Sequence, residues 1–435
     1  MASTPTLFAP ASGFGRAAIA VIRLTGSACE PLLRALAGTC PPPRRLSLRT
    51  LRDPDTGEIL DRALVAWLPG PATYTGEDMA ELHLHGGLAV RAGVIRALSA
   101  FPGCRAAEPG AFTRRAVDHG RLGLTEAEGI GDLIDAETEA QRRQALRQLD
   151  GALGRQVAEW RARAIECLAG AEAALDFSDE GDVDAAGLDA ALLGKASALR
   201  DEIAAALRDD RRGERLREGF CVVLAGPPNA GKSTLLNALS RREAAIVSDI
   251  PGTTRDAIEV RCDLGGLPIL LVDTAGLRET EDRVEAEGIR RTRARMASAD
   301  LVLHLSAADE PARERPDGGP RGLLVTTKAD LAEAGGAGLA VSAVTGWGLD
   351  HLLDAIEARA RADLGGGDAL ITRERHRDAL TRCVASLDRV AAGAPLPELV
   401  AEDLRLAVRA LGEVGGHVGV EEMLDRLFAG FCIGK

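Results

Sequence analysis

The sequence predicts a multidomain α/β protein with three parts: an α+β domain at the front, an α-helical domain, and an α/β domain inserted into the helical one. Residues 1–120 alternate short β-patterns with turns, the residues after them carry apolar side chains at helical spacing, and strand–helix alternation interrupts that spacing. A length of 435 residues also suits about three domains. The expected boundaries are 1–120, 121–216 together with 366–435, and 217–365 for the inserted domain.

The composition is typical of a soluble globular protein. Hydrophobic residues make up 46% and charged residues 27% of the chain, and no run of about 18 apolar residues predicts a membrane span. Residues 1–10 lack the basic-then-apolar order of a signal peptide, and the eight cysteines never form a C-x-x-C pair. We therefore expect a cytoplasmic protein with reduced thiols and no membrane partner. Its net charge of −12 argues against a general electrostatic nucleic-acid binder.

Three segments of the front domain have the alternating apolar pattern of strands. They are Ala18–Leu24, Ala63–Leu68 and Met79–His85. His83 and His85 share a face of the last strand, because side chains two residues apart point the same way. Two roles stay open for this pair: metal binding, or packing and hydrogen bonding to a substrate edge, which we favour.

Apolar spacings of three and four residues predict helices in the second part of the chain. The pattern runs over 124–177, continues over 188–216, and returns over 373–431. Its apolar positions include Leu133, Ile134, Leu146, Leu149, Leu153, Val157 and Trp160. Because the pattern resumes after the inserted domain, we expect one helical domain built from two parts of the chain.

The inserted domain contains Gly226–Ser233, which fits the pattern G-x-x-x-x-G-K-[ST]. Its glycines let backbone N–H groups face a phosphate chain, Lys232 reaches the β- and γ-phosphates, and the Ser233 hydroxyl ligates Mg²⁺. The context agrees, because 220–225 has the pattern of a buried strand and 232–239 that of a helix, whose N-terminus favours an anion. The segment predicts a nucleotide-phosphate site.

Four further motifs follow in the order that a GTPase domain requires. Thr254 supplies a hydroxyl that can close over Mg²⁺ and the γ-phosphate, and Asp273, at the end of the strand 267–273, can hold Mg²⁺ through water. Asp330, after the strand 322–326, can accept the two N–H groups of a guanine edge, which adenine cannot satisfy. Ser342 and Ala343 follow the next short strand, in place for a backbone contact to the guanine oxygen.

Together these motifs predict the residues that contact GTP. They are Asn229, Ala230, Gly231, Lys232, Ser233, Thr234, Ser248, Asp249, Ile250, Pro251, Gly252, Thr253, Thr254, Asp273, Thr274, Ala275, Gly276, Thr327, Lys328, Asp330, Ser342 and Ala343.

Two positions distinguish this domain from Ras-like enzymes. Leu277 stands where those enzymes carry the glutamine that orients the attacking water, and an apolar side chain cannot do that. Another residue must therefore position the water. Asn229 is either a simple turn residue or the donor of an amide oxygen that holds a monovalent cation against the phosphates.

Over essentially its whole length the chain resembles the bacterial tRNA-modification GTPase family called MnmE or TrmE. The resemblance rests on front-domain segments, on the GTPase motifs, and on an ending similar to the family's terminal Cys-x-Gly-Lys. These segments are Tyr74–Asp78, Glu81–Gly87, Pro109–Gly110 with Phe112–Thr113, Ala127–Glu128 with Asp132–Ala136, Asp249–Asp256, Asp273–Glu279 and Phe431–Lys435.

The resemblance implies a K⁺-stimulated, dimerisation-activated GTPase that works with a flavoprotein partner, MnmG or GidA, in a heterotetramer. This family adds a carboxymethylaminomethyl or aminomethyl group to C5 of the wobble uridine of certain tRNAs. The one-carbon unit comes from 5-formyl- or 5,10-methylene-tetrahydrofolate, which the N-terminal domain binds. The same domain forms the homodimer.

The resemblance also implies roles for single residues. Glu285 matches the catalytic glutamate that helps to position the water. The folate-contacting positions are Arg23, Glu81, Arg121 and Lys435. The Mg²⁺ ligands are Ser233 and Thr254, and the K⁺ ligands are Asn229, Ser248, Ile250 and Thr253.

Some positions depart from the family pattern. Thr327 stands where the family has asparagine, and because threonine is shorter we expect weaker nucleotide affinity. Arg121 stands where relatives often have lysine, which keeps the charge. Cys432 is either a nucleophile or redox group of the modification reaction or a small buried residue, and the sequence leaves both open.

A second function stays in view: a regulatory GTPase switch, for example in ribosome assembly, without modification chemistry. The GTPase motifs alone are compatible with it. The front domain and the Cys-Ile-Gly-Lys ending favour the tRNA-modifying enzyme.

Overall fold

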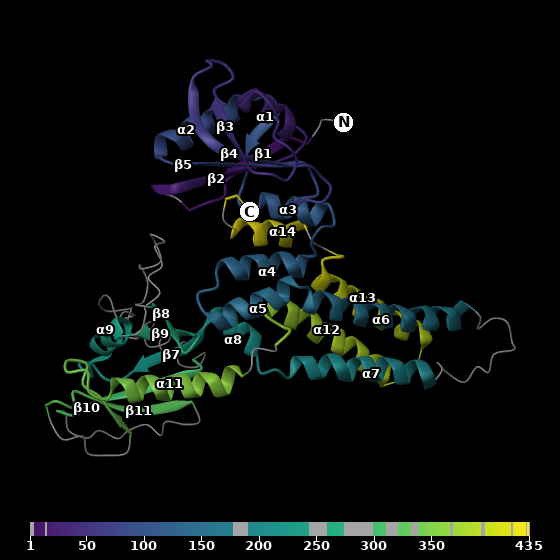
Figure 1. Cartoon of the computed structure of the whole chain (residues 1–435). Helices are drawn as coiled ribbons and strands as arrows, with labels where there is room; N and C mark the ends of the chain where they lie inside the picture. The colour runs from purple at the N-terminus through teal and green to yellow at the C-terminus, as the bar shows by residue number, and fades with distance from the viewer. Residues whose placement is uncertain are drawn as a thin grey trace, which may run out of the picture. The chain divides into compact units, whose positions relative to one another are not determined.

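In the computed structural model the chain folds into two compact units (Figure 1). One unit comprises residues 1–131 and 412–435, and the other comprises residues 132–411. The structure describes residues 4–13, 15–176, 190–242, 259–273, 299–309, 321–331, 338–365, 369–392, 396–418, 421–431 and 433–434.

The first unit is built on a mixed sheet with the strand order β3-β4-β5-β2-β1-β6. Neighbouring strands are antiparallel except β1 and β6, which are parallel. The strands are β1 (Thr6–Pro10), β2 (Ala17–Thr25), β3 (Ser47–Arg52), β4 (Ile59–Leu68), β5 (Met79–Gly86) and β6 (Cys104–Ala106). The three strands predicted from the sequence are confirmed as β2, β4 and β5, and the pattern missed the other three.

One face of this sheet is covered and the other is partly open. Helices α1 (Cys29–Ala37) and α2 (Leu88–Ala100) pack on the covered face, over a core that includes Ile22, Val65 and Leu82. Because strand side chains alternate between faces, Arg23 and Glu81 belong to the opposite face. That face also exposes apolar side chains, namely Ile19, Leu48 and Leu64.

Three further helices complete the first unit: α3 (Ala111–Asp118), α4 (Leu124–Ile134) and α14 (Glu421–Ala429). Leu124 on α4 and Phe428 on α14 share one small core. Gly110 precedes α3 with φ +69°, and a Cβ there would lie 2.6 Å from the Cβ of Phe428, so that only glycine fits. Gly434 lies against β1, because a Cβ on it would lie 2.1 Å from the Pro10 carbonyl oxygen.

The helices of the helical part of the second unit confirm the helical patterns of the sequence. They are α5 (Glu139–Leu149), α6 (Ala152–Asp176), α7 (Ala190–Leu207), α8 (Arg212–Glu218), α12 (Glu374–Ala391) and α13 (Pro397–Gly415). Leu153, Val157 and Trp160 are buried on α6, as the spacing predicts. On α5 the buried side chains are instead three glutamines and an alanine, because this helix packs through amide hydrogen bonds onto α8.

A second sheet, with the order β12-β11-β10-β7-β9-β8, forms the α/β part of this unit. All its pairings are parallel except that of β8 with β9. Its strands are β7 (Phe220–Ala225), β8 (Glu259–Leu264), β9 (Leu267–Asp273), β10 (Leu301–Ala307), β11 (Gly322–Thr327) and β12 (Leu339–Ala340). Helices α9 (Lys232–Arg242) and α11 (Leu349–Leu364) share its larger core. The predicted fold class is confirmed, and the predicted domain boundaries stay predictions.

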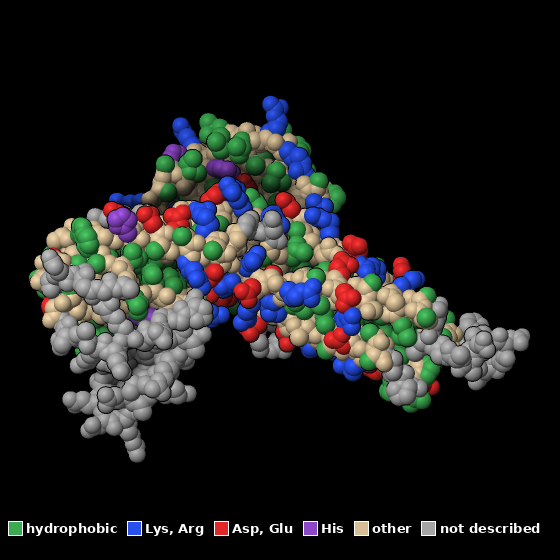
Figure 2. Space-filling view, turned by 90° about the horizontal axis from the view of Figure 1, so that it is seen from below, with side chains coloured by type: hydrophobic (Ala, Val, Ile, Leu, Met, Phe, Trp, Pro, Cys, Tyr) green, Lys and Arg blue, Asp and Glu red, His purple; other side chains and the backbone are tan. Residues whose placement is uncertain are grey.

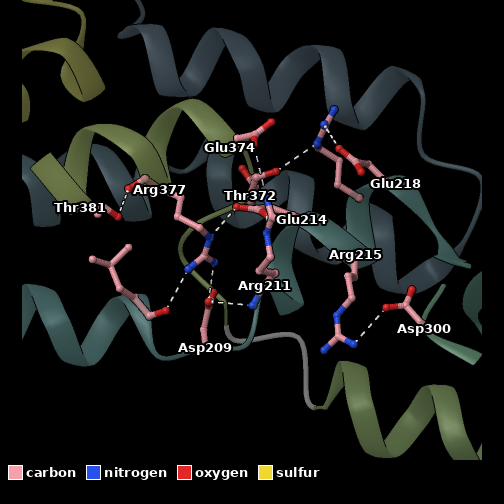
Figure 3. A network of polar contacts seen from close by, with 12 residues as sticks. Asp209, Arg211, Glu214, Arg215, Glu218, Asp300, Thr372, Glu374, Arg377 and Thr381 are labelled. Carbon is pink, nitrogen blue, oxygen red and sulfur yellow. Dashed lines mark hydrogen bonds and ion pairs between the residues drawn. The ribbon is translucent and has the colours of Figure 1, made fainter. Parts of the chain in front are cut away.

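Helix α8 joins the helical and α/β parts of the second unit through ion pairs (Figure 3). Arg377 of α12 donates to Asp209 at 2.6 Å and to Glu214 of α8 at 2.8 Å. On the same short helix, Arg215 donates to Asp300 at 3.2 Å. Asp300 in turn accepts from the Cys221 backbone N–H of β7, so that side chains link α12 to the strand that leads into the phosphate loop.

Within the described parts of the chain, no helix combines the length and the apolar character needed to cross a membrane. On the face shown in Figure 2, basic and acidic side chains are interspersed over the helical part.

Candidate functional site

The phosphate loop connects β7 to α9 at the edge of the second sheet where the parallel strands end. Lys232 begins α9 and is largely buried, and its ammonium donates to the carbonyls of Gly226 at 3.0 Å and Pro227 at 2.8 Å. A Cβ at Gly226 would lie 2.7 Å from the Leu305 carbonyl oxygen, so this turn requires glycine. Asn229 has φ +65° and Gly231 has φ +81°, which gives the loop its tight bend.

The two predicted Mg²⁺-binding side chains of the described loop region lie together. The Ser233 hydroxyl on the first turn of α9 donates to Asp273 Oδ2 at 2.5 Å, and Asp273 is fully buried at the end of β9. Hydroxyl and carboxylate oxygens are the ligand types that Mg²⁺ prefers. The donor set fits this ion, and Ser233 and Asp273 are the described residues that would hold it.

The predicted base-reading segment follows β11. Asp330 is exposed, and among the described residues no hydrogen-bond or ion-pair partner contacts its carboxylate, so both oxygens can accept from a guanine edge. Thr327 is only 3% exposed, and its hydroxyl lies within hydrogen-bond distance of the carbonyls of Ala230, at 2.7 Å, and of Ser306, at 3.3 Å. The threonine therefore contacts the phosphate loop. The expected weaker nucleotide affinity stays a prediction.

Sequence reasoning missed Asp309 as a partner of this segment. Lys328 Nζ lies 3.1 Å from each carboxylate oxygen of Asp309, which holds the lysine beside the base-reading segment. Sequence reasoning had no signal for it, because the contact depends on the parallel pairing of β10 with β11, where Ala307 is the register partner of Thr327. Residues that follow the two strand ends are therefore neighbours.

Ser342 and Ala343 lie in a loop whose conformation is fixed by its own hydrogen bonds. Ser342 is buried, its N–H donates to the Trp347 carbonyl at 2.9 Å, and its hydroxyl accepts from the Thr345 N–H at 3.1 Å. An open pocket of about 480 Å³ lies between this loop and α9. Thr234 and Ala343, both predicted to contact the nucleotide, line that pocket together.

Several predicted site residues lie outside the described residues. These are Ser248, Asp249, Ile250, Pro251, Gly252, Thr253, Thr254, Thr274, Ala275, Gly276, Leu277, Glu285, Cys432 and Lys435.

On the open face of the first sheet, two of the predicted folate residues form an ion pair. Arg23 on β2 and Glu81 on β5 are register partners, and Arg23 donates through Nε and Nη2 to Glu81 Oε1 at 3.3 and 3.2 Å. The Arg23 guanidinium lies 5.9 Å from the centre of the Tyr74 ring, and the Tyr74 hydroxyl lies 2.7 Å from Thr113 Oγ1. Burial raises the pKa of Tyr74. Arg23 thus already donates to Glu81. An acidic group of a ligand would have to bind the Arg23 guanidinium together with the Glu81 carboxylate.

Arg121 and the chain end approach the same region of the first unit. The Arg121 stem packs against the loop that carries Tyr74, because a Cβ at Gly76 would lie 3.3 Å from Arg121 Cγ. Gly434 lies against Pro10 of β1, and Pro10 is the register partner of Ile22 on β2, next to Arg23. A carboxylate for pterin N–H groups and an arginine for an acidic tail therefore lie within one set of neighbouring elements, which fits a folate.

Each histidine of β5 bonds to a carboxylate. His83 Nε2 lies 3.1 Å from Glu81 Oε2, and His85 Nδ1 lies 2.7 Å from Asp61 Oδ1. A search of the described residues finds no group of three or more His, Cys, Asp and Glu side chains arranged to hold a metal ion. Both bonds lie within the chain itself, so metal binding and hydrogen bonding to a substrate edge both stay predictions for this pair.

Comparison with known protein families matches two consecutive segments of the chain. Residues 6–121 match the family described as the GTP-binding protein TrmE N-terminus, and residues 124–432 match the MnmE helical domain. A protein of Methylorubrum populi named tRNA modification GTPase MnmE is 76% identical, over 99% of this chain and 98% of its own length. Proteins of the same name are 70% identical in Methylobacterium radiotolerans, over 100% of both chains, and 53% identical in Rhodospirillum rubrum, over 99% of both.

Proposed function

Because the chain belongs to the family of tRNA modification GTPases called MnmE, we propose that it couples GTP hydrolysis to a folate-dependent modification of tRNA. It is a GTP hydrolase that acts in tRNA modification. In our proposal two copies act in the cytoplasm with the flavoprotein MnmG, or GidA, as a heterotetramer. The product carries a carboxymethylaminomethyl or aminomethyl group on C5 of the wobble uridine of certain tRNAs.

One observation carries the hydrolytic half of this proposal: the Ser233 hydroxyl and the buried Asp273 carboxylate meet at 2.5 Å, next in the chain to Lys232, whose ammonium bonds to the carbonyls of the phosphate loop. Lys232 leaves its loop carbonyls for the β- and γ-phosphates of GTP, while the N-terminus of α9 faces the same charge. Ser233 and Thr254 would ligate Mg²⁺, and Asp273 would hold the ion through water. Mg²⁺ bound there neutralises charge that develops on the phosphate oxygens.

The transition state needs a second positive charge and a positioned water. Asn229 in the phosphate loop, with Ser248, Ile250 and Thr253, is our choice for the K⁺ ligands, and Glu285 is our choice for the residue that orients the water. K⁺ held by this set supplies the charge that an arginine finger supplies elsewhere. Support comes from the family resemblance and from Asn229, which takes φ +65° at the exposed rim of the loop.

The K⁺ part is tested by measuring GTP hydrolysis in KCl and in NaCl at equal ionic strength. We expect K⁺ to raise the rate at least about tenfold, in line with the loss of one transition-state charge partner. The Asn229→Ala variant keeps nucleotide binding and loses the difference between the salts. Equal rates of the unaltered protein in the two salts would contradict the K⁺ assignment.

Dimerisation through the first unit is supported by the open face of its sheet. Leu48 and Leu64 are register partners on β3 and β4, and Ile19 lies on the same face on β2. All three are exposed, with Leu48 at 67%, and such a patch favours association with another apolar surface. A second copy of the chain is the occupant we propose. Leu64→Glu is expected to give monomers in size-exclusion chromatography with light scattering.

The modification half is tested on tRNA itself. Mass spectrometry of wobble uridines from cells that lack this chain should show uridine without the C5 group, and the unaltered gene should restore it. Normal wobble modification together with defective ribosomes would instead support a regulatory GTPase switch in ribosome assembly.

The folate half is tested by titrating the full chain with 5-formyltetrahydrofolate, where Arg23, Glu81, Arg121 and Lys435 are the proposed contacts.

A further inference from the structure

The Glu81 carboxylate is held at both of its oxygens. Arg23 donates twice to Oε1, at 3.3 and 3.2 Å, and His83 Nε2 lies 3.1 Å from Oε2. The three side chains are 23–26% exposed, so the group is partly withdrawn from water and still reachable. Arg23 is paired with Glu81 across the sheet, and His83 is two residues along the same strand and on the same face.

Counting acceptor positions shows which oxygen is left for a ligand. An ionised carboxylate offers about four lone-pair positions, two on each oxygen. Arg23 uses both positions of Oε1, and His83 uses one position of Oε2, in the tautomer that carries its proton on Nε2. Among the described residues nothing else bonds to this carboxylate. The remaining acceptor position is therefore on Oε2, the oxygen that His83 orients.

We propose that His83 is a positioning residue of the folate site, where it aims Glu81 Oε2 at the N–H donors of the pterin ring. This inference rests on the proposed folate function. The family resemblance implies that Glu81 contacts folate, and it implies no folate contact for His83. Cross-strand neighbours of His83 are Leu64 and Val21, which carry no polar group, so Glu81 is the partner that fixes the imidazole.

His85 provides a matched control on the same strand. It lies two residues further on, shares the face, and also bonds to a carboxylate, with Nδ1 2.7 Å from Asp61 Oδ1. Its side chain is 71% exposed, against 26% for His83. If a histidine–carboxylate bond merely stabilises the sheet, the two positions respond alike. If His83 positions Glu81 for a ligand, only position 83 affects binding.

The experiment titrates the full chain with 5-formyltetrahydrofolate and, separately, with a tetrahydropterin that lacks the p-aminobenzoylglutamate tail, by calorimetry. His83→Leu is expected to weaken both ligands by the same factor, about fivefold to tenfold, as for one lost hydrogen bond to a charged group. His83→Gln keeps an N–H donor and restores most of the affinity. His85→Leu stays within about twofold of the unaltered chain. Arg121→Gln, which removes a contact to the acidic tail, weakens the folate and leaves the tetrahydropterin unchanged.

Two outcomes overturn the inference while the unaltered chain binds folate. One is an unchanged affinity in His83→Leu, and the other is an equal loss in His83→Leu and His85→Leu. Failure of the unaltered chain to bind folate would refute the proposed folate function itself, and no variant is needed to see it. Thermal unfolding and GTP hydrolysis of each variant show whether it is folded, because neither histidine belongs to the GTPase machinery.

Discussion

The Thr327 hydroxyl lies 2.7 Å from the Ala230 carbonyl oxygen, across 97 positions in the chain. This bond connects the end of β11, which leads into the predicted base-reading segment, to the predicted phosphate loop. Both groups are buried, so water cannot replace the bond once it is broken. We therefore expect a change at Thr327 to act on the phosphate loop as well as on the predicted base-reading segment.

Thr327→Val keeps the shape of the side chain and removes the hydroxyl. We expect it to weaken GDP and GTP equally, by about tenfold, because a buried hydrogen bond is worth about 1.4 kcal/mol in this setting. Equilibrium titration with fluorescent nucleotides measures both constants. Thr327→Ser is the control that retains the hydrogen bond. A loss of affinity confined to GTP would contradict the tether, by which we mean the bond from Thr327 to the Ala230 carbonyl. If threonine weakens guanine affinity, as the sequence predicts, Thr327→Asn tightens binding.

Ser233→Ala removes the hydroxyl that meets Asp273. We expect GTP hydrolysis to fall at least about 100-fold, because the metal ion that supplies several kcal/mol of charge stabilisation loses a ligand. The rate is followed by phosphate release over a range of Mg²⁺ concentrations, with EDTA as the metal-free reference. Ser240→Ala on the same helix is the control, since among the residues that the structure describes the Ser240 hydroxyl bonds to the Asn237 carbonyl of its own turn. Similar losses in the two variants would argue against a ligand role.

Arg377→Met is expected to destabilise the chain. Arg377 is 17% exposed and bonds Glu214, which is 7% exposed, and Asp209. Without the arginine, Asp209 loses this guanidinium partner, and Glu214 keeps Arg211, which is 55% exposed and pairs with it at 2.5 Å. The two partly buried carboxylates are then poorly compensated, at a cost of about 3 kcal/mol. Arg405 also bonds two carboxylates, those of Glu172 and Glu402, but it is 50% exposed.

Arg405→Met is therefore the matched control and should cost less than about 1 kcal/mol. Urea unfolding followed by circular dichroism compares the two midpoints. Equal shifts would mean that burial does not decide the strength of these ion pairs.

Alkaline pH should weaken the fold through Cys383. This thiol is fully buried on α12, and burial raises its pKa from 9.0 to about 12. Between these values the unfolded chain loses the proton and the folded chain keeps it, so the free energy of unfolding falls as pH rises. Thermal unfolding from pH 8 upwards should show a smaller slope in Cys383→Ala than in the unaltered chain. An unchanged slope would mean that this thiol does not contribute.

Much of the fold follows from patterns of apolar residues. The strands β2, β5, β7 and β9 are recognisable because most of their side chains alternate into a core or are buried on both faces. Strand β3 was missed, since Leu51 is its one fully buried residue and its pairing with β4 supplies the rest. On α5 the helical pattern was right, but Leu146 and Leu149 are only half-buried while Gln144 and Gln148 are buried. Local spacing does not reveal that the neighbouring α8 offers backbone carbonyls.

The sequence by itself determined the phosphate loop, the order of the GTPase motifs and the family, because glycine, lysine and hydroxyl positions at fixed spacing depend on local backbone geometry. Only the tertiary structure decided which distant groups meet. The contact of Ser233 with Asp273, the Thr327 tether and the division of Glu81 between Arg23 and His83 all depend on strand order and register. Apolar alternation specifies which face a side chain takes, and it does not specify which strand lies beside it.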